Sequence, residues 1–118
     1  MTRIPEKDRD IIETAMYLPM LLIVLERDLF IINNSPFKLP RPYLELIELT
    51  IKAVQADLKI AKDFLRKEQI KIAEIQRDSD FTMYSFIYKG FEERHNYFNP
   101  RLRNKTEELL QHYLHTKK

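Results

Sequence analysis

The sequence contains no cysteine, no tryptophan and only one glycine among 118 residues. Without cysteine, the chain can form neither a disulfide framework nor a thiolate metal site, which is compatible with a reducing cytoplasm. With one glycine, it cannot build a glycine-rich phosphate-binding loop or a nucleophile elbow, because both need backbone conformations that glycine allows. We therefore expect a non-catalytic protein without a cofactor.

Long apolar runs and a strong net charge are also absent. The stretch from Thr14 to Leu25 carries no charge, but it has only 12 residues, whereas a membrane-spanning helix needs about 20. The formal net charge of +2 permits a polyanionic partner without requiring one. We expect a cytoplasmic protein with no membrane segment.

The sequence does contain one long helical pattern, which begins near Tyr43. Apolar residues recur at steps of three and four, as on one face of an α-helix. The first set is Leu44, Ile47, Ile51, Val54, Leu58, Ala61 and Leu65. A second set on the neighbouring face is Leu46, Leu49, Ala53, Ala56, Ile60 and Phe64. Together they cover an arc of roughly 220°, which predicts a helix that is covered on two sides.

Proline and asparagine residues mark the other expected boundaries. A first helix should begin near Pro5 and be kinked at Pro19, because proline removes a backbone donor and crowds the preceding turn. Residues 37–42 should form a stiff connection in which Phe37 and Leu39 pack down onto the protein. Asn99 and Pro100 are suited to the start of a last helix.

Residues 81–98 are ambiguous and hold seven of the chain's aromatic residues. Helical spacing connects Phe81, Tyr84, Tyr88, Phe91, His95 and Phe98. However, residues 81–88 are rich in β-forming side chains, and Lys89-Gly90 is suited to the turn of a hairpin. We favour the helix because its pattern continues past Gly90, and we keep the hairpin as the alternative.

These patterns predict a single helical domain over residues 1–118. Its class is all-α, an elongated four-helix bundle with one long central helix over about residues 42–77 and a first helix kinked at Pro19. A helix of that length measures about 54 Å, which is too long for a compact globule with a radius of gyration near 14 Å. The bundle is therefore elongated, or a second molecule covers part of the helix.

The leading functional hypothesis is a non-catalytic interaction protein, possibly a regulatory or accessory factor. It would act through helix–helix contacts with itself, most simply as a dimer, or with another protein. Exposed apolar patches commonly mark interfaces. The expected anchors are Leu65, Ile72, Ile75, Tyr84, Tyr88 and Phe91.

The first alternative is a nucleic-acid-associated accessory protein. Basic side chains neutralise phosphates, and neighbouring aromatic rings stack on unpaired bases. The two candidate basic groups are Lys52, Lys59, Lys62 and Arg66, and then Arg94, Arg101, Arg103 and Lys105. Interleaved acidic residues argue for an ordinary charged surface instead.

A helical metal protein is the third hypothesis. Glu92 and His95 are three residues apart and would share a helix face. Di-iron sites in helical bundles need two such pairs, and the sequence offers one around these aromatics. We therefore expect no metal, with Glu92 and His95 as weak candidates.

Overall fold

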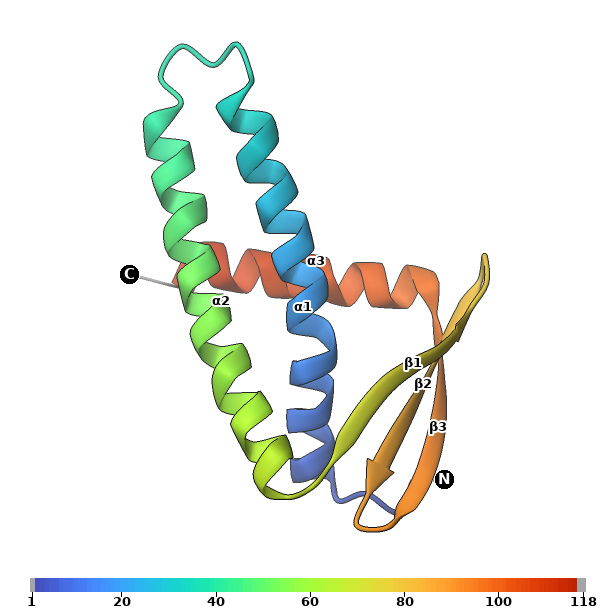
Figure 1. The fold of residues 1–118 in the computed structure, drawn as a ribbon. Helices are drawn as coiled ribbons and strands as arrows, with labels where there is room; N and C mark the ends of the chain where they lie inside the picture. Colours follow the sequence, from blue (N-terminus) through green and yellow to red (C-terminus); the bar gives the residue numbers. More distant parts are fainter. Residues whose placement is uncertain (1, 117–118) are drawn as a thin grey trace.

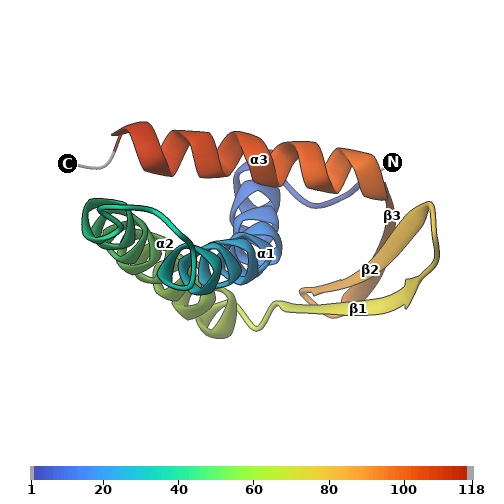
Figure 2. The same ribbon diagram turned by 90° about the horizontal axis from the view of Figure 1, so that it is seen from above.

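The computed structural model describes residues 2–116, which form three helices and three strands. The elements in chain order are α1 (Glu6–Asn33), α2 (Arg41–Lys67), β1 (Lys71–Arg77), β2 (Phe81–Tyr88), β3 (Phe91–Phe98) and α3 (Asn99–Thr116). Helices α1 and α2 form an antiparallel hairpin, and the sheet lies beside the first half of α1 (Figure 1). Helix α3 crosses one face of this hairpin (Figure 2).

The chain is therefore an α+β protein, and the predicted all-α four-helix bundle is wrong. Its sheet is antiparallel with the strand order β1-β2-β3. The predicted central helix over residues 42–77 ends at Lys67. The backbone of Gln69 then takes a positive φ of 57°, a left-handed conformation that ends a helix. Ile72 and Ile75 consequently belong to β1.

Residues 81–98 form the hairpin that was the alternative to a helix. Strands β2 and β3 pair from Phe81 with Phe98 to Tyr88 with Phe91. The two residues between them, Lys89 and Gly90, have φ values of 48° and 89°. Positive φ at both central positions is the requirement of a tight type I′ hairpin turn.

Three further expectations concern the helices and the connection between them. The last helix begins at Asn99, as predicted. Helix α1 runs as one element through Pro19. In the connection to α2, Phe37 and Leu39 are 46% and 73% exposed, so the expectation that they pack down is wrong.

The core has two neighbouring parts. One lies between the first half of α1 and the inner face of the sheet, and includes the fully buried Ile12 and Phe86. The other lies between the helical hairpin and α3, and includes Leu21, Val54 and Tyr113. The molecule is elongated, with extents of 54 × 32 × 18 Å and a radius of gyration of 16.2 Å. Within residues 2–116, every helix is too short or too polar to cross a membrane.

Candidate functional site

One face of α2 is apolar and exposed to solvent. Leu46, Leu49 and Ile60 are 44%, 63% and 69% exposed. Ala53 and Ala56 lie between them at steps of three and four residues, and Ala56 is exposed as well. These five residues, which we name the α2 apolar face, belong to the second helical set that the sequence contains. The prediction that the chain covers α2 on two sides is therefore wrong at this face.

The opposite face of α2 explains why the helix is nevertheless stable. Ile47, Val54, Leu58 and Leu65 are buried there. Helix α3 crosses α2 beside the apolar face, where the hydroxyl of Tyr113 donates a hydrogen bond of 2.6 Å to the carboxylate of Asp57. In both views α2 lies on the side of the hairpin that faces away from most of the sheet (Figures 1 and 2).

Charged residues border the α2 apolar face. Glu45 lies 3.7 Å from Arg41, and Lys59 lies 3.1 Å from Asp63. Both ion pairs are exposed to solvent, so each contributes little to stability and can be exchanged for other partners. Hydrogen bonds from Lys59 and Arg66 lower the pKa of Asp63, which stays ionised at neutral pH.

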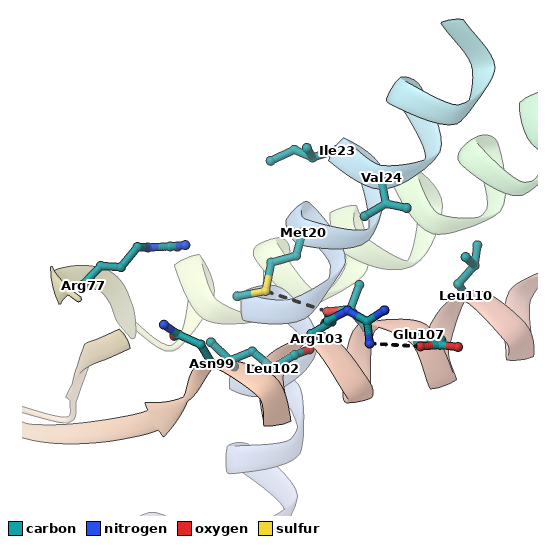
Figure 3. A pocket seen from close by; sticks show the side chains of 10 residues that line it. Met20, Ile23, Val24, Arg77, Asn99, Leu102, Arg103, Glu107 and Leu110 are labelled. Carbon is teal, nitrogen blue, oxygen red and sulfur yellow. Dashed lines mark hydrogen bonds and ion pairs between the residues drawn. The ribbon is translucent and has the colours of Figure 1, made fainter. Parts of the chain in front are cut away.

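A groove of about 670 Å³ lies between α1 and α3 (Figure 3). Met20, Ile23 and Val24 form its wall on α1. On the α3 side, Arg103 pairs with Glu107 at 3.5 Å, so the charges at this wall compensate one another.

A polar network joins the inner face of β3 to the start of the chain. The carboxylate of Glu93 accepts hydrogen bonds of 2.7 Å from the Thr2 hydroxyl and from the backbone N–H of Arg3. His95 Nε2 lies 2.9 Å from the same carboxylate. Burial alone would raise the pKa of Glu93, but these hydrogen bonds outweigh it and lower the pKa to about 2. The network therefore holds the N-terminal segment against the sheet.

The predicted anchor residues lie mainly inside the protein. Three of them are buried at the junction of α2 and the sheet, which makes them core residues that cannot serve as exposed anchors. Leu65, Tyr84 and Tyr88 are buried, Ile72 and Phe91 are half-buried, and Ile75 is exposed. The hydrogen bond from Tyr88 to Asp8, with burial as a smaller cause, raises the pKa of Tyr88 to about 12.

The two predicted basic groups are distributed over three elements. The first group, Lys52, Lys59, Lys62 and Arg66, is exposed on α2. In the second group, Arg94 lies on β3 and pairs with Glu92 at 3.3 Å, whereas Arg101, Arg103 and Lys105 lie on α3.

Glu92 and His95, the weak metal candidates, do not share a face. They are three residues apart on a strand, so their side chains point to opposite sides of the sheet. His95 stacks on Phe86, with 4.9 Å between ring centroids. Within residues 2–116, no group of three or more histidine, cysteine, aspartate or glutamate side chains is arranged to hold a metal ion.

Sequence reasoning identified the residues of the α2 apolar face but assigned them to the interior. It missed the polar network on β3, because the pattern was interpreted with a helical period. A period of two over residues 91–98, which alternates half-buried and exposed side chains, would have placed Glu93, His95 and Tyr97 on one face.

Comparison with known proteins gives the family of the chain. The model of the YhjD protein family matches residues 3–118. The protein YhjD of Bacillus subtilis (strain 168) is 45% identical over 114 residues, which cover 97% of this chain and 95% of that protein. No solved structure matches the chain. The chain therefore belongs to the YhjD protein family.

Proposed function

We propose that this chain is a non-catalytic interaction protein that associates with a second copy of itself through the α2 apolar face. The supporting observation is the exposure of Leu46, Leu49 and Ile60 along one side of a regular helix. Such a side is unfavourable in water and is suited to a helix–helix contact. We place the protein in the cytoplasm, since a chain without cysteine is compatible with a reducing compartment.

The second copy is favoured over another partner because the face is nearly symmetric about Ala53. Leu46 precedes Ala53 by seven residues, and Ile60 follows it by seven. Two α2 helices that cross antiparallel at this position bring Leu46 and Leu49 of one copy against Ile60 of the other. The small side chains of Ala53 and Ala56 allow the helices to approach closely at the centre. This is an isologous contact, the kind that closes a two-fold dimer.

Charge complementarity supports the same antiparallel arrangement. Glu45 and Lys59 lie seven residues before and after Lys52, on the same border of the apolar face. In the antiparallel pair, each Glu45 therefore lies near Lys59 of the second copy. In a parallel two-fold pair, this border of one helix lies on the opposite side from the same border of the other, so Glu45 and Lys59 would not meet.

The expected affinity is modest. Burying three large side chains per copy that are now half to two-thirds exposed contributes about 1–2 kcal/mol each. Association itself costs at least about 4 kcal/mol. The balance of at most about 2–8 kcal/mol corresponds to a dissociation constant in the millimolar range, or in the low micromolar range at best.

Sedimentation equilibrium over a concentration series tests the proposal with three proteins. The wild-type chain should change from monomer to dimer as its concentration rises. Leu49→Lys should remain a monomer, because dimerisation would bury an unpaired ammonium. The matched control is Gln55→Lys, which adds the same charge at an exposed position on another face of α2 and should dimerise like the wild type. A wild-type chain that is monomeric at every concentration contradicts the proposal.

Nucleic-acid binding is the alternative function. It predicts binding to labelled oligonucleotides that weakens steeply with salt concentration. Fluorescence anisotropy at low salt tests it. The basic residues occupy α2, β3 and α3, and several are already paired with acids, so no specific observation places this function ahead of self-association.

A further inference from the structure

A cavity of about 620 Å³ lies between α1, β3 and the start of α3. Three regular spacings direct side chains to it: steps of four on α1, a strand face on β3, and a step of four on α3. The lining residues that matter here are Arg9, Glu13 and Tyr17 of α1, Tyr97 of β3, and Arg101 and Lys105 of α3.

The charges in this cavity are not balanced. Glu13 is already engaged, because it accepts a hydrogen bond of 2.8 Å from the Tyr97 hydroxyl and lies 3.7 Å from Arg9. Lys105 lies 3.8 Å from Glu108 in an exposed pair, which holds it weakly. Arg101 has no acidic partner within residues 2–116. Three cationic side chains thus meet one carboxylate that is already bound.

Tyr17 adds a hydrogen-bond donor to the cavity. Its side chain is only 7% exposed, and its hydroxyl lines the cavity without a hydrogen-bond partner in the described part of the chain. Among the described residues no fully buried side-chain oxygen lacks a hydrogen-bond partner, so the Tyr17 hydroxyl is open to the cavity and can donate to a bound ligand. An acceptor bound in the cavity would satisfy it.

The first turn of α3 points to an anion as well. It contains no acidic residue, and it carries Arg101. Cations at a helix N-terminus interact unfavourably with the helix dipole. A bound anion beside Arg101 would reverse this unfavourable interaction, because helix N-termini favour negative charge.

We propose that this cavity binds a small organic phosphate. Arg9, Arg101 and Lys105 would hold the phosphate oxygens through charge-assisted hydrogen bonds, and the Tyr17 hydroxyl would donate one more. The rings of Tyr97 and Phe98 line the same cavity and would contact an aromatic or apolar body of the ligand. The volume lies in the range of small-molecule sites, about 300–1,000 Å³. This inference does not depend on the proposed self-association.

Calorimetric titration at constant ionic strength tests the site with four ligands: phenyl phosphate, inorganic phosphate, phenol and a single-stranded oligonucleotide. Phenyl phosphate should bind saturably with a dissociation constant below about 1 mM, more tightly than inorganic phosphate, and phenol should not bind. Arg101→Gln should weaken binding about ten-fold, because the residue has no other partner. Tyr17→Phe removes one oxygen and should weaken binding about three- to ten-fold.

The matched control is Arg103→Gln on the same helix. Arg103 pairs with Glu107 and lines the groove between α1 and α3 instead of this cavity, so its loss should leave phosphate binding unchanged. Three results would overturn the proposal: no saturable binding of phenyl phosphate up to about 10 mM, equal weakening in the Arg103 variant, or binding of the oligonucleotide alone.

Discussion

Glu93 shows how a single carboxylate can fix a chain terminus to a sheet. It lies on the inner face of β3, where an apolar side chain is the usual choice. Instead it binds Thr2, the backbone of Arg3 and His95, all within 2.9 Å. Because these partners favour the ionised form, the pKa of Glu93 lies near 2.

This pKa predicts how acid changes the stability. The folded-state pKa is about 2 and the ordinary value is 4.5, so the stabilising effect is complete above about pH 5 and is lost as the pH falls towards 2. After allowance for solvent at this partly open site, it amounts to about 1–2 kcal/mol. Glu93→Gln should lower the unfolding free energy by that amount at pH 7.

Urea denaturation at several pH values measures the effect. The difference between the wild type and Glu93→Gln should shrink between pH 5 and pH 2. Other carboxylates titrate in the same range, so the difference between the two proteins is the informative quantity. If the difference in unfolding free energy between the two proteins stays the same across this range, the ionisation of Glu93 does not contribute to the pH dependence of stability.

At the scale of elements, the strands are the part that sequence reasoning assigned incorrectly. Aromatic residues lie on both faces of β2, and the inner face of β3 carries Glu93 and His95. Neither strand therefore shows the alternation of apolar and polar residues that would distinguish it from a helix. The turn residues Lys89 and Gly90 were the correct local signal, and a helical period of the aromatics outweighed it.

The β2–β3 turn gives a paired prediction. Gly90 has a φ of 89°, and an added Cβ would meet nothing within 4 Å. Gly90→Ala should therefore destabilise the protein only through backbone strain, by about 1–2 kcal/mol. Lys89→Asn should stabilise it by roughly 0.5 kcal/mol, because asparagine tolerates positive φ at this turn position.

Thermal and urea denaturation of both variants measure these changes. If the turn is a tight hairpin turn, Gly90→Ala should lower the free energy of unfolding and Lys89→Asn should raise it. A neutral Gly90→Ala substitution would mean that the turn does not hold Gly90 at positive φ.

The helices were predictable to different degrees. The start of α3 followed from Asn99 and Pro100, and the two apolar sets of α2 were evident from spacing alone. The end of α2 was not, because Ile70, Ile72 and Ile75 continue an apolar pattern that both a helix and an edge strand can use. The left-handed backbone at Gln69 has no strong sequence signal, since glutamine seldom adopts it.

For the whole molecule, the elongated shape and the α2 apolar face have one common explanation. The helical hairpin extends well beyond the sheet and α3 (Figure 1), so these elements cannot cover all of its apolar residues. Sequence spacing shows that a helix face is apolar, but it does not show whether the same chain covers it. The exposed fractions of Leu49 and Ile60 supply that information.

The antiparallel dimer makes a specific prediction about charge. Glu45→Lys alone should place lysines opposite one another, and Lys59→Glu alone should do the same with glutamates. Each substitution should weaken self-association at least about 30-fold, since two exposed ion pairs of roughly 0.5–1 kcal/mol each change sign, which amounts to about 2–4 kcal/mol. When the two variants are mixed, both pairs between positions 45 and 59 are of opposite charge.

Sedimentation equilibrium of the mixed Glu45→Lys and Lys59→Glu variants is the strongest test of antiparallel self-association. Each variant alone should be largely monomeric at a concentration where the wild type is dimeric. An equimolar mixture should form heterodimers at least as tight as the wild-type dimer. A mixture that associates no better than the separate variants would contradict antiparallel self-association through α2.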